Sequence, residues 1–208
     1  MIEADFLYAF IFNHKPLKII QIGCGVSTSV ILRACRDAGY HPELVCVDPI
    51  PMPYLVNLSD KGSIRLIKEK AQKVHIDLLT ELSDNDFFFV DSTHSVKPGS
   101  EVNRIILEVL PRLQKKVWVH FHDIFFPYDY TRDILTHDMF FWSESILLQA
   151  FLTQNPNFTI KASLSMLHYA ETENLKRYFL KYDPQSNEFG LRGKQGKHFP
   201  SSTYLQVV

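Results

Sequence analysis

The chain has little of several features that would place it outside the ordinary globular proteins. It holds three cysteines among its 208 residues, and this low, odd number favours reduced thiols in a cytoplasmic protein over a disulfide framework. The net charge of −1 gives no reason to expect nucleic acid or a membrane surface as a partner. No apolar run reaches the roughly 18 residues that a membrane span needs, and the acidic start lacks the basic segment of a secretory signal.

What is present agrees with one well-buried domain. Apolar residues make up 46% of the chain and charged residues 22%, which is typical of a globular protein. At this length we expect a single domain over residues 1–208. Its core is predicted at about 17–165, followed by a C-terminal extension of strand and loop over 166–208.

The most informative stretch is an apolar run that stops at the turn Gly23-Cys24-Gly25. The turn leads into a predicted helix that opens with the hydroxyl residues Ser27 and Thr28. A strand, a glycine turn and a helix in this order place backbone N–H groups and a helix N-terminus beside a bound cofactor. The same pattern also occurs as a tight turn without any ligand.

A second apolar run ends in Asp48, 48 − 23 = 25 positions after the first glycine. A carboxylate at the tip of the next strand is placed to accept hydrogen bonds from a ribose diol. A dinucleotide site would have a third glycine three positions after Gly25, where this chain has Thr28. The turn therefore suits S-adenosylmethionine (SAM) better than a pyrophosphate, and a nicotinamide-dependent oxidoreductase is the less favoured alternative.

Strands and helices alternate along the chain. The spacing of apolar residues predicts helices at 4–13, 27–38, 76–82 and 143–154, and one that begins after Ser100. Strands are predicted at 18–22, 44–48, 63–68, 87–91, 117–123, 158–164 and 203–208. The proline-rich stretch 49–53 is expected to be a stiff loop, 125–142 a loop or lid, and 186–202 a mobile loop. This order is typical of an α/β fold with a doubly wound, mainly parallel seven-stranded sheet.

Four side chains lie at or just after the ends of predicted strands and are expected at one edge of the sheet: Asp91, His94, His122 and Asp123. Carboxylates and imidazoles at this edge are competent ligands for a divalent metal. Alternatively, His94 or His122 acts as a general base near neutral pH, in a site that includes Asp123. A structural interpretation, in which the acids cap turns and the histidines bond to backbone, stays open. His120, two positions before His122, is expected to pack inside the sheet.

The chain resembles the class I SAM-dependent methyltransferases, in the branch called methyltransferase domain 24. The resemblance covers roughly residues 17–165 and is carried by the stretches Ile20-Gln21-Ile22-Gly23-Cys24-Gly25-Val26-Ser27-Thr28, Val45-Cys46-Val47-Asp48-Pro49, Phe89-Val90-Asp91-Ser92-Thr93-His94-Ser95-Val96-Lys97-Pro98-Gly99-Ser100-Glu101-Val102, Glu108-Val109-Leu110-Pro111-Arg112-Leu113 and His120-Phe121-His122-Asp123-Ile124-Phe125.

The resemblance implies a role for each matching position. The implied SAM contacts are Gly23 and Gly25 at the methionine part, Ser27 or Thr28 at its carboxylate, Asp48 at the ribose, Ala71 and Gln72 at the adenine, and Asp91 at the sulfonium side. Some relatives bind magnesium at the ends of the fourth and fifth strands, and Asp91 and Asp123 are the matching positions here.

Three departures from the family pattern bear on activity. Gln21 stands where relatives carry an acid that anchors the ammonium of the cofactor, so it is implied to contact SAM without adding charge. Lys73 replaces an acid near the adenine, and Lys115-Lys116 replaces a Pro-Gly pair. A binding or scaffold protein that keeps this fold without turnover is therefore a second alternative.

The sequence predicts methyl transfer to an oxygen or nitrogen of a small molecule or glycan. The reaction would be an in-line displacement on the sulfonium methyl, with oxygen favoured because a hydroxyl acceptor needs the base or metal that these strand ends offer. A homodimer is left open.

Overall fold

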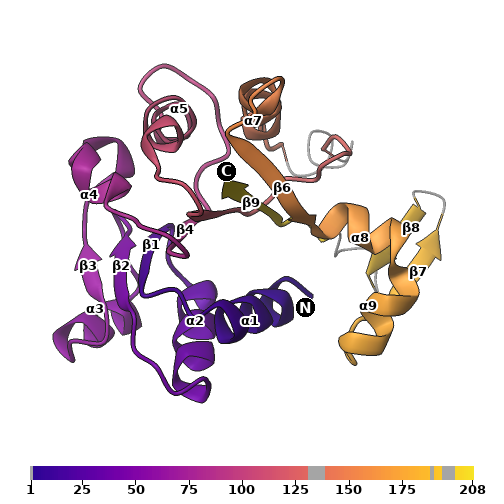
Figure 1. Ribbon diagram of the computed structural model, residues 1–208, viewed down its shortest axis with the longest axis horizontal. Coiled ribbons are helices and arrows are strands. Elements are labelled where there is room, and N and C mark those ends of the chain that lie inside the picture. Colours follow the sequence, from indigo (N-terminus) through magenta and orange to yellow (C-terminus); the bar gives the residue numbers. More distant parts are fainter. Residues whose placement is uncertain (1, 131–138, 188–189, 194–199) are drawn as a thin grey trace.

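A seven-stranded sheet forms the centre of the computed structural model (Figure 1). The structure describes residues 2–130, 139–187, 190–193 and 200–208. The strand order is β3-β2-β1-β4-β5-β9-β6. Strands β1 to β5 pair in parallel, whereas β9 is antiparallel to both β5 and β6. The predicted doubly wound, mainly parallel sheet is confirmed. The strands are β1 (Lys18–Ile22), β2 (Glu43–Val47), β3 (Arg65–Ile67), β4 (Phe87–Val90), β5 (Trp118–Phe121), β6 (Phe158–Ser163) and β9 (Thr203–Val207).

Helices cover both faces of this sheet (Figure 1). One face packs against α1 (Ile2–His14), α2 (Val26–Asp37) and α3 (Pro53–Asp60). The other face packs against the 3₁₀ helix η1 (Ala71–Lys73), α4 (Ile76–Thr80), α5 (Glu101–Arg104) with its continuations η2 (Ile105–Val109) and η3 (Leu110–Arg112), and α7 (Glu144–Leu152).

Strand β4 shows why the central strands are apolar on both sides. All four of its residues are buried. Phe87 and Phe89 belong to the core on the α1 and α2 face, and Phe88 and Val90 belong to the core beneath α5. Side chains of a strand alternate between faces, so a strand covered by helices on both faces must be apolar throughout.

The structure differs from the sequence-based expectation in three segments. Helix α3 starts at the last residue of the stretch expected to be only loop, because Pro53 occupies the first helical turn, where its missing N–H costs nothing. After β6 the chain forms α8 (Leu164–Ala170) and α9 (Thr172–Tyr178) instead of strand and loop alone. Part of the stretch expected to be a mobile loop forms a two-stranded sheet, β7 (Pro184–Asn187) with β8 (Gly190–Gly193), and 194–199 lie outside the described residues.

The register of the sheet brings the predicted site residues to one edge. Ile22 pairs with Val47 on one side and with Val90 on the other. Val90 in turn pairs with the last residue of β5. The residue after each of these strand ends therefore lies at the same edge, at the carboxyl ends of the parallel strands. In the described part of the chain, no helix is both long enough and apolar enough to cross a membrane.

Candidate active site

The glycine turn after β1 depends on Gly23 for a steric reason. Gly23 has a φ of +77°, and a Cβ atom built on it would lie 1.7 Å from the backbone carbonyl oxygen of Asp91. The turn can therefore lie against the end of β4 only because position 23 has no side chain. Gly25 differs, since a Cβ there would meet no atom within 4 Å. The turn thus leaves open space at its second glycine, at the N-terminus of α2.

Gln21 shapes this turn from beneath. Its side chain is fully buried, and its Nε2 donates to the carbonyl oxygen of Gly23 at 3.0 Å and to Oγ of Ser27 at 2.8 Å. Its Oε1 accepts a hydrogen bond from Oγ1 of Thr28 at 3.0 Å. Both amide donors of Gln21 are therefore used by the turn, and only Oε1 retains capacity to accept from a cofactor. Its direct contact with the cofactor stays a prediction.

Asp48 faces the glycine turn. Its Oδ2 accepts a hydrogen bond from the backbone N–H of Cys24 at 3.2 Å, and its Oδ1 accepts one from the N–H of Ile50 at 2.8 Å. An ionised carboxylate has about four acceptor positions, so two of them remain for a diol. The hydroxyl of Tyr54, on α3, donates to the carbonyl oxygen of Gly25 and adds a residue that the sequence analysis missed. No short-range sequence pattern predicts this contact of Tyr54, and α3 itself was not predicted.

Ala71 and Gln72 lie in η1, beyond the end of β3. Ala71 is buried, and its carbonyl oxygen accepts a hydrogen bond from Nη1 of Arg104 at 3.0 Å, which fixes η1 against α5. Gln72 is half-buried and Lys73 is exposed. The position agrees with a cofactor site at this edge, and the contact with an adenine stays a prediction.

His94 lies at the centre of a cluster of acids at the ends of β4 and β5. Its Nδ1 is 2.8 Å from Oε2 of Glu144, at the start of α7. Its Nε2 lies 3.6 Å from Oδ1 of Asp91 and 3.4 Å from Oδ2 of Asp123. Both His94 and Glu144 are buried. The structure thus brings together three of the four predicted strand-end residues, and His94 is also paired with Glu144, an acid 50 positions away in the sequence.

The surroundings of His94 favour its charged form. Burial opposes that form, but the hydrogen bonds to Asp91 and Glu144 and the charges of Glu144 and Asp123 outweigh it and raise the pKa of His94 to about 10. Burial also raises the pKa of Glu144, and the contact with His94 opposes this shift. A histidine that is already protonated at neutral pH cannot accept a proton from a substrate. The geometry therefore argues against the predicted role of His94 as general base.

The surroundings of Asp91 and Asp123 do not fit the predicted magnesium site. Both carboxylates face the ring of His94, and its Nδ1 is held by a third carboxylate. Among the described residues, no group of three histidine, cysteine, aspartate or glutamate side chains has the geometry to hold a metal ion. The donor set therefore does not fit a resident cation, because a histidine ring stands between the two acids.

His122 is placed differently from His94. Its side chain is 31% exposed, its Nε2 is 3.7 Å from Oδ1 of Asp123, and its Nδ1 is 3.3 Å from Oγ of Ser202. Ser201 donates to Oδ1 of Asp123 at 2.9 Å, so two serines before β9 support this end of β5. His120 is buried as predicted, and its ring stacks on Phe89 at 4.3 Å. Of the histidines on β5 and its end, only His122 reaches solvent at this edge.

One further acid, Glu101, contacts the loop after β4. Glu101 lies in the first turn of the helix predicted after Ser100, and its carboxylate accepts a hydrogen bond from the N–H of Thr93 at 3.0 Å. Glu144 was likewise part of a predicted helix and carried no signal of its pairing. Both acids lie in the first turn of a helix, where an acid is common, so the sequence did not indicate their contacts at the candidate site.

Aromatic rings border the cluster on the side of α7. The ring of Trp142 lies 4.8 Å from that of His94, Phe140 stacks on Trp142 at 5.2 Å, and Tyr130 contacts Trp142 edge-on at 5.8 Å. Phe125 and Phe126 are buried and pack inward. We call Tyr130, Phe140 and Trp142 the aromatic wall, and residues 131–138, which fall between them in the sequence, lie outside the described residues.

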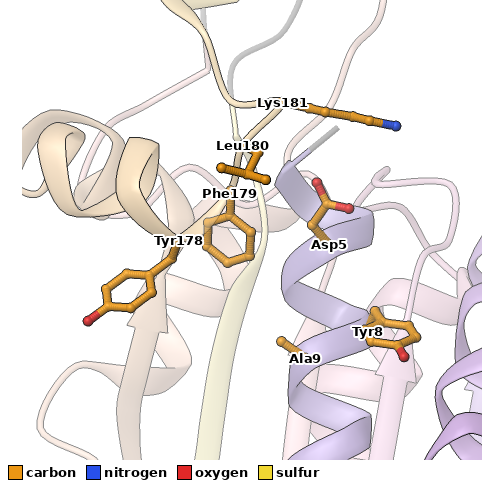
Figure 2. A pocket seen from close by; sticks show the side chains of 7 residues that line it. All are labelled: Asp5, Tyr8, Ala9, Tyr178, Phe179, Leu180 and Lys181. Carbon is orange, nitrogen blue, oxygen red and sulfur yellow. The ribbon is translucent and has the colours of Figure 1, made fainter.

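A separate groove of about 380 Å³ lies between α1 and the segment that follows α9 (Figure 2). Figure 2 shows Tyr178 and Phe179 on one side and Tyr8 and Asp5 on the other. The groove contains none of the predicted site residues. It therefore gives no support to the chemistry at the strand ends.

Comparisons with known proteins agree with this geometry. The model of a methyltransferase domain matches residues 20–124, about half of the chain. The solved structures with the same fold include the SAH-bound methyltransferase PaMTH1 of Podospora anserina, with 16% identity and a TM-score of 0.53, covering 99% of this chain and 78% of that one. Cofactor-bound Rv0187 from MTB matches with 14% identity and a TM-score of 0.54, covering 99% and 79% of the two chains.

A putative caffeoyl-CoA O-methyltransferase from Staphylococcus aureus matches with 11% identity and a TM-score of 0.51, covering 99% of this chain and 83% of that one. No curated protein sequence matches the chain. The family match and the fold assign the chain to the class I SAM-dependent methyltransferases. The chain belongs to the methyltransferase-domain family, whose model matches from within β1 to just beyond β5.

Proposed function

We propose that the protein binds SAM at the carboxyl ends of β1, β2 and β4 and moves its methyl group to an oxygen of a small molecule or glycan. The observation that carries this proposal is the pairing of Asp48 with the glycine turn. Asp48 is held by the N–H of Cys24, and open space lies beside Gly25. A ribose would therefore meet a carboxylate, while the methionine part would pass over the second glycine.

The reaction would be a displacement in line with the sulfonium. An acceptor oxygen forms a bond to the methyl carbon, the bond from that carbon to sulfur breaks, and S-adenosylhomocysteine (SAH) leaves. The hydroxyl proton passes to His122, the half-exposed histidine at the end of β5, and from it to water. Alignment of the two reactants at about 3 Å supplies most of the rate enhancement.

The acceptor would lie along the aromatic wall. Phe140 is 48% exposed and stacks on Trp142, which itself borders the acid cluster. Such faces bind the apolar side of a sugar or another flat ring, and the nearby acids accept its hydroxyl groups. This arrangement supports oxygen as the acceptor atom, because a hydroxyl needs the base that His122 provides.

The test is calorimetry with SAH and the variant Asp48→Ala. We expect the wild type to bind SAH and Asp48→Ala to bind at least about tenfold more weakly, since hydrogen bonds to a charged acceptor are worth about 1.5–3 kcal/mol. The control is Asp60→Ala at the exposed end of α3, which should leave affinity unchanged. Equal SAH affinity in all three proteins, or NAD binding without SAH binding, would contradict the proposal.

A binding protein without turnover is the second candidate. It is favoured by Gln21, whose amide donors are both used within the turn and which adds no negative charge for the ammonium of SAM. This candidate also expects SAH binding. It differs in giving no labelled product when radioactive SAM is offered with a broad panel of hydroxylated acceptors, whereas the methyltransferase gives a product that is lost in His122→Asn.

A further inference from the structure

The two acids that match the magnesium ligands of relatives face a single histidine ring. Nε2 of His94 is 3.6 Å from Asp91 and 3.4 Å from Asp123, and Nδ1 is 2.8 Å from Glu144. The side chain of His94 is 7% exposed, and that of Glu144 is fully buried. Three acids from β4, β5 and α7 thus converge on one ring.

With all three acids ionised, the hydrogen-bonding chemistry of this cluster favours a positive ring. Ionised carboxylates only accept hydrogen bonds, so a ring nitrogen that faces one of them must carry a hydrogen. Both nitrogens of His94 face carboxylate oxygens. A neutral ring would turn a lone pair toward at least one acid, and a ring with both nitrogens protonated avoids this.

We propose that the ring of His94, anchored by Glu144, takes the place of a divalent cation between Asp91 and Asp123. The inference rests on the proposed function, because it concerns the same site. The ring supplies the positive charge that allows two acids to lie close to the sulfonium side of the cofactor, and it does so without a metal ion. Glu144 is a positioning residue, which acts through His94 and does not touch the substrate.

The backbone reinforces this arrangement. His94 has a φ of +56°, a conformation that histidine adopts rarely. Its carbonyl oxygen accepts hydrogen bonds from the N–H groups of Ser143 at 2.8 Å and Glu144 at 3.1 Å. The β4 loop is therefore tied to the start of α7 through both the backbone and the side chain of His94. The ring is therefore held in place at both its backbone and its side chain.

The proposal is tested by binding of Mn²⁺, followed by electron paramagnetic resonance, in the wild type and in His94→Asn. Asparagine tolerates the left-handed conformation and is smaller than histidine, so the variant opens the space between the acids. We expect no tight Mn²⁺ binding by the wild type and one Mn²⁺ per chain in His94→Asn. That Mn²⁺ should be lost in the double variant His94→Asn/Asp123→Asn.

The matched control is His122→Asn, which makes the same chemical change beside Asp123 but outside the space between the two acids. It should gain no Mn²⁺. Circular dichroism and SAH calorimetry on every variant show whether the fold and the cofactor site remain. If His94→Asn does not fold, His94→Gly, which also accepts a positive φ, replaces it.

The results separate this inference from the proposed function. One tightly bound Mn²⁺ in the wild type would overturn the inference even if SAH binds normally. Absence of Mn²⁺ from both the wild type and a folded His94 variant would overturn it as well, because the space would then not be a cation site. Failure of all proteins to bind SAH would instead overturn the proposed function.

Discussion

The two glycines of the turn have different roles, one in the fold and one in the candidate cofactor site. Gly23 is required by the fold, since a Cβ at this position would lie 1.7 Å from the carbonyl oxygen of Asp91. Gly25 has an extended φ of −177° and free space around it, so the fold would accept a larger residue there. If the turn binds a cofactor, that free space is what the cofactor uses.

Gly23→Ala should therefore reduce stability, whereas Gly25→Ala should reduce SAH binding. We expect Gly23→Ala to lower the free energy of unfolding by about 3 kcal/mol or more, because it combines a steric clash with a strained φ. Gly25→Ala should unfold nearly like the wild type and yet bind SAH more weakly. Urea denaturation and calorimetry measure the two effects. Loss of stability in Gly25→Ala, or unchanged SAH binding, would show that position 25 does not line the cofactor.

Glu144 provides a second contrast at this scale. Removing one partner of a buried ion pair leaves the other charge uncompensated. We expect Glu144→Ala to lower the free energy of unfolding by about 3–5 kcal/mol. The control is Glu173→Ala in the exposed pair with Lys176, which has the same 2.8 Å separation and should change stability little. Similar unfolding curves for the two variants would mean that His94 is stable without its anchor.

Individual elements begin and end for local reasons that can be tested one at a time. Helix α5 begins after Ser100, whose Oγ accepts a hydrogen bond from the N–H of Asn103 at 3.3 Å. This cap matters beyond the helix, because the next residue, Glu101, holds the β4 loop at Thr93. The helix start and the loop that carries His94 are thus parts of one structure.

We expect Ser100→Ala to lower the free energy of unfolding by about 1 kcal/mol, because the first turn of α5 loses its side-chain cap. Ser100→Asp should restore most of this loss, since aspartate caps a helix equally well. Thermal and urea denaturation of the three proteins measure the difference. Equal instability of both variants would place the role of Ser100 in packing rather than in capping.

Elements governed by local sequence were the predictable ones. The apolar strand β4 and the cap at Ser100 follow from neighbouring residues, and both are confirmed. Helix α3 was not predicted, because a segment with three prolines favours a loop. The last of these prolines, Pro53, in fact starts the helix. The place of β9 between β5 and β6 is a long-range pairing that no local pattern specifies.

The same limit applies to the candidate site. The glycine turn, Asp48 and the acids after β4 and β5 stand at strand ends, so the sequence places them at one edge. The contact between His94 and Glu144 joins residues 50 positions apart and depends on how α7 packs. The fit of the predicted metal site could not be judged from the sequence for the same reason, because the position of a histidine ring between two acids is a tertiary feature.

For the whole molecule, the shifted pKa values of His14, His94 and His120 make stability depend on pH, and they act in opposite directions. Burial lowers the pKa of His14, and burial with the nearby His122 lowers that of His120 well below its usual value. These two groups favour folding above their unfolded pKa of about 6.5, and their contribution falls as pH drops. For His94 the acids outweigh burial and raise the pKa to about 10, so its contribution is complete below about 6.5 and falls as pH rises toward 10.

Stability should therefore be greatest near pH 6.5 and should decline toward pH 7.5, below the range in which the thiols of the unfolded chain lose their protons. In this window the folded chain holds one more proton than the unfolded chain, so the free energy of unfolding falls by at most about 1.4 kcal/mol per pH unit. His94→Asn should abolish this decline while keeping the loss of stability in acid, which comes from His14 and His120. Urea denaturation at half-unit intervals from pH 5 to 7.5 measures both the loss of stability in acid and the decline above pH 6.5. A decline of equal slope in the wild type and in His94→Asn would show that the acids around position 94 do not hold a charged ring.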